Sequence, residues 1–210
     1  MSIIPSYEAL KDLARRKRSE YGVLTTALNL LVVRKIYKAE NIRIDSWEFP
    51  RTIRAVYMCD DGDPSVAINN TLPREPKLFS LVHELKHHYV DQQLIENGEI
   101  RCGDYNQRQE IEIGAEVFAA EFIYPEGEFL DSVRALNIQP MKCSPEDVVR
   151  LKRECGACVS YQFLRKRLIR MGFASKNAFD KIQFQNLEEK IYGVPVYKRD
   201  WFKKRRLVHR

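Results

Sequence analysis

The chain has 210 residues, of which 44% are hydrophobic and 30% charged, proportions ordinary for one globular domain with a small appendage. No apolar run approaches the roughly 20 residues that cross a bilayer, and residues 1–5 lack a signal-peptide pattern, so we expect a cytoplasmic protein without a membrane partner. The net charge of +6 lies in residues 198–210, which hold seven Lys or Arg and one Asp, so the body is near neutral, unlike most DNA-binding domains.

The first part of the chain predicts two helices. Ser6 is placed to cap a helix that ends near Glu20. A second helix is expected over residues 25–39, because apolar residues recur there at helical spacing. Its expected apolar face consists of Leu28, Leu31, Val32 and Ile36.

Alternation of apolar and polar residues then predicts three short strands. They are expected around residues 42–47, 53–59 and 66–69, with a turn at residues 61–64 before the last strand. The sequence therefore predicts a small, largely antiparallel sheet. The strand that ends at Asn69 is a candidate for binding substrate by strand addition.

Helical spacing returns in the rest of the chain. Helices are expected over residues 76–94 and 108–123, with a polar loop at 96–107 between them. Ser144 and Ser160 are each placed to cap a further helix, and the two helices form a helix-turn-helix-like pair.

The predicted organisation is an α+β protein in three parts. Residues 1–126 form a mainly helical domain with the small sheet, residues 127–190 a helical extension that contains the helix pair, and residues 191–210 a basic tail. The five cysteines are an odd number, which argues against a disulfide framework and favours ordinary thiols at Cys155 and Cys158.

Residues 83–87 read His-Glu-Leu-Lys-His in a segment with helical spacing. Helical residues four apart share a face, so His83 and His87 can direct imidazole nitrogens at one zinc ion, about 2.0–2.1 Å away. Glu84 then lies next to the metal's open position, where it can take a proton from the zinc-bound water. The alternative is a chance match on a surface helix. Histidine is scarce, however, and three of the four histidines lie between positions 83 and 88.

A catalytic zinc ion takes three protein ligands and keeps one open position. The helix expected at 108–123 offers four glutamates. Glu112 is the expected third ligand, because its face also carries small residues that allow close approach to the zinc helix. Glu116, one turn on, is expected to hold a zinc-bound histidine by its other nitrogen. Glu110 and Glu121 are expected to be solvated helix charges.

Three segments together resemble the ImmA/IrrE family of metallopeptidases. They are Asn69, residues 78–87 (LFSLVHELKH) and residues 112–125 (EIGAEVFAAEFIYP). That family pairs an HExxH helix with a downstream helix of the type ExxA(N/D)xFAA. The resemblance implies a zincin-like metallopeptidase domain, zinc bound by His83, His87 and Glu112, and Glu84 as the catalytic acid/base.

The resemblance also implies a biological setting. It suggests a cytoplasmic peptidase of a bacterium or mobile element, whose protein substrate is a helix-turn-helix transcriptional repressor. Zn²⁺ is the implied cofactor, and Mn²⁺ is an alternative occupant. Lys86, His88, Gly114 and Glu116 depart from the commoner choices of the family, although none of them removes a ligand or the base.

Two other functions remain open at this point. The first is a DNA-binding transcriptional regulator with a vestigial or sensory metal site, favoured by the basic tail and by the second helix of the pair. The basic residues of that helix are Arg165, Lys166, Arg167 and Arg170. The second is a peptide-binding module that keeps zinc without cutting.

Overall fold

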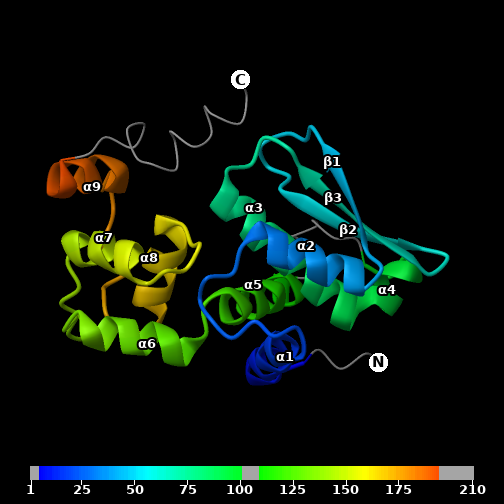
Figure 1. Cartoon of the computed structure of the whole chain (residues 1–210), viewed down its shortest axis with the longest axis horizontal. Helices are drawn as coiled ribbons and strands as arrows, with labels where there is room; N and C mark the ends of the chain where they lie inside the picture. The colour runs from blue at the N-terminus through cyan, green and yellow to red at the C-terminus, as the bar shows by residue number, and fades with distance from the viewer. Residues whose placement is uncertain (1–4, 101–108, 194–210) are drawn as a thin grey trace. The chain divides into compact units, whose positions relative to one another are not determined.

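A computed structural model of the chain describes residues 5–100 and 109–193 (Figure 1). Most of the predicted loop at 96–107 and of the predicted tail at 191–210 lies outside the described residues. The described part divides into two units. The first runs to Phe129 and includes Gly156–Val159, whereas the second comprises Leu130–Cys155 and the described residues from Ser160 onward.

The fold is α+β, as expected. The elements are α1 (Tyr7–Glu20), α2 (Leu30–Ala39), β1 (Arg43–Trp47), β2 (Ala55–Asp60), β3 (Asp63–Asn69), α3 (Arg74–Lys86), the π-helical turn η1 (His87–Asp91), α4 (Gln92–Glu96), α5 (Gln109–Ile123), α6 (Glu126–Ala135), α7 (Pro145–Glu154), α8 (Tyr161–Arg170) and α9 (Phe184–Tyr192). Within the described residues, every helix is too short or too polar to span a bilayer.

Side-chain caps decide where the first two helices begin. The Ser6 hydroxyl accepts a hydrogen bond from the backbone of α1, as expected. The second helix begins at Leu30 rather than near residue 25, because Asn29 Oδ1 accepts the backbone N–H groups of Leu31 and Val32. The buried face of α2 also differs from the expected one, since Leu31 is 69% exposed. The buried residues of α2 are Val33, Ile36 and Tyr37.

The sheet has the strand order β1-β3-β2 and is mixed. β1 pairs with β3 in parallel and β2 pairs with β3 antiparallel, so that Ile44 and Tyr57 both lie opposite Val66. β3 is therefore the central strand, and its backbone is hydrogen-bonded on both sides. The expectation that the strand ending at Asn69 binds substrate by strand addition is wrong for this reason.

The elements of the first unit stack in succession from the sheet outward. Helix α3 packs on β2 and β3, α5 packs on α3, and α1 packs on α5 (Figure 1). Fully buried apolar side chains fill the contacts between these layers, among them Leu78, Val82, Leu85, Ala115, Phe118 and Phe122. This core holds α3 and α5 side by side.

Asn69 closes the turn between β3 and α3. Its side-chain amide donates to the carbonyls of Phe49 and Ile53, at 3.1 and 3.0 Å, while Oδ1 accepts the N–H and hydroxyl of Thr71. We expect Asn69→Ala to lower the free energy of unfolding by about 2–4 kcal/mol, because it leaves several buried polar groups unpaired. Urea denaturation would measure this, with the exposed neighbour Asn70→Ala as the control. Equal midpoints for the two variants would contradict the expectation.

In the second unit, both expected helix starts are confirmed. Ser144 and Asp147 form a reciprocal capping box on α7, and Ser160 caps α8. Helix α9 was not predicted; its buried Phe184 stacks on Tyr161 at a centroid distance of 4.9 Å.

Candidate metal centre

Helix α3 and the turn that continues it bring two histidines together. His83 lies in the last turn of α3 and His87 begins η1, and both are buried. Their Nε2 atoms are 3.3 Å apart. The two nitrogens thus face the same point, as the spacing of four residues predicts.

Glu112 reaches this pair from the first turn of α5. Its Oε2 lies 3.1 Å from His83 Nε2, and its Oε1 lies 3.8 Å from His87 Nε2. One ligand atom from each of the three residues lies within 4.8 Å of the other two. Two imidazoles and one carboxylate form the donor set of many catalytic zinc sites, so this group can hold a metal ion.

The surroundings of His83 favour positive charge. Burial lowers the pKa of His83, but the hydrogen bond to Glu112 and the negative charges of the neighbouring glutamates raise it by more, so its pKa lies above the usual value. The same negative charges would attract a metal ion to this position.

Glu84 lies in the same buried region but is not one of the converging ligands. Burial raises the pKa of its carboxyl group, and so does the charge of Glu112. The two histidines and a backbone hydrogen bond from Tyr57 lower it by less, so its pKa lies above the usual value. Its Oε2 is buried and has no hydrogen-bond partner among the described residues. Because buried polar atoms are nearly always paired, this oxygen indicates a place for a group outside the chain, such as a water molecule on the metal.

Asp91 supports the histidine pair, and sequence reasoning missed it. Its Oδ2 lies 2.8 Å from His87 Nδ1, the nitrogen that faces away from Glu112. Asp91 ends η1, and single π-helical turns of this kind occur often at functional sites. The available signal was an acid four residues after His87, in a pattern that continues the helix.

The other glutamates of α5 have different surroundings. Glu116 is half-buried, and its charge helps to raise the pKa of His83, so its role as a histidine acceptor stays a prediction. Glu110 is exposed, as expected. The expectation that Glu121 is solvated is wrong, since it is 2% exposed and pairs with Arg15 at 2.8 Å. It also accepts the backbone N–H of Glu126 and so holds the start of α6.

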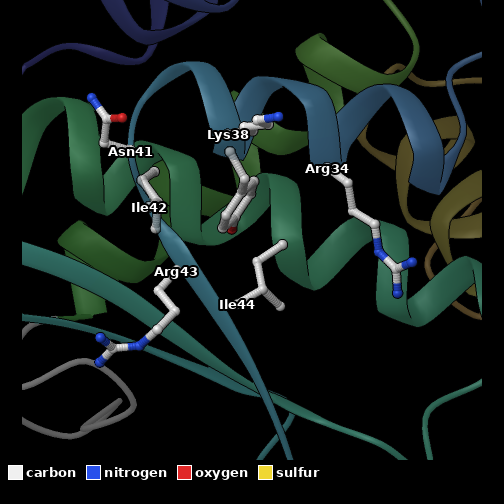
Figure 2. A pocket seen from close by; sticks show the side chains of 7 residues that line it. Arg34, Lys38, Asn41, Ile42, Arg43 and Ile44 are labelled. Carbon is white, nitrogen blue, oxygen red and sulfur yellow. The ribbon is translucent and has the colours of Figure 1, made fainter.

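A surface hollow of about 400 Å³ lies elsewhere, between α2 and β1 (Figure 2). Its cationic side chains are Arg34, Lys38 and Arg43, and their charged ends point in different directions (Figure 2). Arg43 is also paired with Asp45 and Asp63. The charges do not converge on one point, so the hollow has no built anion site.

Cysteines form no part of a metal group in the described residues. Cys143 and Cys155 are buried thiols, and Cys158 is a half-buried one. Within residues 5–100 and 109–193, His83, His87 and Glu112 form the group with metal-ligand spacing. Burial raises the pKa of Cys143 to about 12, so this thiol is a poor metal ligand and nucleophile.

A histidine pair one turn apart, a glutamate beside it and a second carboxylate from another helix form the arrangement expected of a zincin-like metallopeptidase. The sequence model of the Peptidase_M78 family, described as the IrrE N-terminal-like domain, matches residues 25–168. The chain belongs to this family, which confirms the resemblance found from the motifs.

The fold also has a solved counterpart. The structure of a Mycobacterium tuberculosis transcriptional regulator is similar, with a TM-score of 0.52 and 20% sequence identity. The match covers 77% of this chain and 46% of the other, so this chain spans less than half of that protein's length. At this identity the likeness shows the fold alone. No curated protein sequence matches the chain.

Proposed function

We propose that the protein is a zinc-dependent endopeptidase that hydrolyses a peptide bond in a protein substrate. One observation carries this proposal: His83, His87 and Glu112 converge within 4.8 Å, next to a glutamate with an unpartnered buried oxygen. A purely structural cluster would pair that oxygen within the protein. Family membership supports the same chemistry.

The chain's own residues have separate tasks in this reaction. His83, His87 and Glu112 hold the ion, which when bound polarises a carbonyl and lowers the pKa of a water ligand. Glu84 accepts the proton of the attacking water at its free oxygen and passes it to the leaving amine. Burial raises the pKa of this carboxyl group above its usual value, which favours its gain of a proton.

We expect the activity to depend on metal. Dialysis against a chelator should abolish cleavage, and added Zn²⁺ should restore it, because removal of the ion leaves only a buried pair of histidines and two carboxylates. Mn²⁺ tested in parallel would show whether that ion also supports activity. Cleavage that persists in protein shown to be metal-free would contradict the proposal.

We propose a helix-turn-helix transcriptional repressor as the substrate, acted on in the cytoplasm. The support is the family resemblance of the two motif helices rather than any feature of a substrate groove. To test this directly, the Zn²⁺-loaded protein is incubated with the repressor encoded nearest to its gene, and the fragments are identified by mass spectrometry. If the repressor stays intact while an unrelated unfolded protein is cleaved, the proposed peptidase activity stands and this substrate is rejected.

The DNA-binding alternative has weaker support. On α8, Lys166 and Arg170 are exposed, one turn apart. Arg165, however, packs over the rings of Phe179 and Phe184, and therefore serves the packing of its own unit. A salt-dependent shift of duplex DNA by the intact protein, without cleavage of any repressor, would favour this alternative.

A further inference from the structure

Lys86 lies inside the histidine motif and is almost completely buried. Its exposed fraction is 1%, its Nζ lies 2.6 Å from Asp91 Oδ2, and it donates to the carbonyl of Ile111 at 3.2 Å. Lysine is seldom fully buried, because removing its charge from water is unfavourable unless a partner offsets the lost hydration. Its position between two histidines therefore calls for a specific role.

The partner of Lys86 is also the partner of His87. Asp91 Oδ2 contacts Lys86 Nζ and His87 Nδ1 with the same oxygen, at 2.6 and 2.8 Å. A histidine can bind a metal through Nε2 only when that nitrogen carries no proton, so Nδ1 must carry it. Asp91 stabilises this tautomer by accepting the Nδ1 proton, and the ammonium of Lys86 holds the carboxylate in place.

The second contact of Lys86 reaches the other ligand-bearing helix. Ile111 immediately precedes Glu112 in the first turn of α5, and its carbonyl accepts the hydrogen bond from Lys86. Lys86 thus connects the support of His87 to the backbone beside Glu112. One ammonium group fixes two of the three ligands relative to each other.

Gly114 lies where α5 approaches both α1 and Lys86. A Cβ at this position would lie 2.9 Å from Leu10 Cδ1 and 3.6 Å from Lys86 Cε. Glycine is unfavourable in a helix interior relative to alanine, and the closeness of Leu10 gives its presence in α5 a packing reason. Lys86 and Gly114 are two of the departures from the commoner family residues, and they lie near each other where α3 packs on α5.

We infer that Lys86 is a positioning residue of the metal centre, which holds Asp91 against His87 and the start of α5 against α3. The inference rests on the proposed function, since it assumes that His83, His87 and Glu112 bind zinc. Lys86 is almost completely buried and is therefore not exposed to a substrate. Its effect should therefore appear in metal affinity and in the tautomer of His87.

The test measures the dissociation constant for Zn²⁺ by chelator competition. We expect Lys86→Met to weaken binding by about 10–100-fold, the usual effect of losing an outer partner of a metal ligand. Asp91→Asn should also weaken binding, and the loss in the double variant should be smaller than the product of the two single losses, because Lys86 and Asp91 share one contact and only the contact of Lys86 with Ile111 is separate. Nitrogen-15 NMR of the metal-free protein should show the Nδ1–H tautomer of His87 in the wild type and a mixture in Lys86→Met.

Arg18→Met is the matched control. Arg18 is another buried cation, and it donates to the carbonyls of Phe122 and Thr25, away from the histidines. It should lower stability and leave Zn²⁺ affinity unchanged. If Lys86→Met does not fold, Lys86→Gln is used instead, because an amide can still donate a hydrogen bond to Asp91. The Zn²⁺ affinity of Lys86→Gln should lie between those of the wild type and Asp91→Asn.

The outcomes separate the two proposals. A wild-type protein that binds no Zn²⁺ rejects the proposed function. A wild type that binds Zn²⁺ and cleaves, with unchanged affinity and an unchanged His87 tautomer in the Lys86 variants, rejects the role of Lys86 alone. Losses that multiply in full in the double variant would also overturn it, since Lys86 would then act independently of Asp91.

Discussion

Replacement of Glu84 by Gln is expected to slow substrate cleavage by about 10²–10⁴-fold while Zn²⁺ remains bound. The amide has nearly the same size as the carboxyl group, so the buried site should keep its shape. It cannot accept a proton from water, however, and the reaction loses its general base. Steady-state cleavage rates and the Zn²⁺ content of the purified variant measure the two parts of this prediction.

Glu110→Gln is the control for this variant. Glu110 is an exposed glutamate at the start of α5, so the same change of charge there should leave the cleavage rate as it is. Normal activity in Glu84→Gln would show that another group takes the proton. Loss of zinc from Glu84→Gln would instead show that this carboxylate is part of the metal-binding group.

The parts of the site that follow from helical geometry could be predicted. His83 and His87 share a helix face by spacing alone, and their Nε2 atoms do converge. The position of Glu112 was harder to predict, because it depends on how α5 packs on α3. Small residues on α5 and the family motif together indicated its place, and it lies in contact with the histidine pair.

The parts that depend on tertiary contacts could not be predicted. Asp91 reaches His87 through a π-helical turn, and nothing in an apolar pattern distinguishes such a turn from a continuing helix. Glu121 resembles a surface charge in the sequence, and only the position of α1 shows that Arg15 covers it. Lys86 was noted as a departure, but its burial against Asp91 and Ile111 depends on how α3 packs on α5.

In the sheet, too, the local pattern could be predicted and the long-range pairing could not. The alternating pattern located all three strands to within a few residues, because it is a local property of each strand. The order β1-β3-β2 depends on long-range pairing, and it makes β3 the central strand. A substrate that adds to this sheet must therefore use an edge strand, β1 or β2. The backbone of β2 also contacts Glu84 through Tyr57.

Glu112→Gln and Glu116→Gln form the second pair of variants with large expected differences. The two glutamates are one turn apart on α5, but only Glu112 has its oxygens at 3.1 and 3.8 Å from the histidine nitrogens. A neutral amide is a weak zinc ligand, and a catalytic site with two remaining protein ligands holds its ion poorly. We therefore expect Glu112→Gln to lose Zn²⁺ and activity together.

Glu116→Gln should have a smaller effect, because its influence on His83 acts through charge rather than through a contact with the ion. If Glu116 also accepts a proton from a zinc-bound histidine, Zn²⁺ affinity should fall by about 10–100-fold in this variant. Zn²⁺ titration of both proteins distinguishes the roles. Equal affinities for Glu112→Gln and the wild type would remove Glu112 from the ligand set, since the loss of a third ligand cannot leave metal binding unchanged.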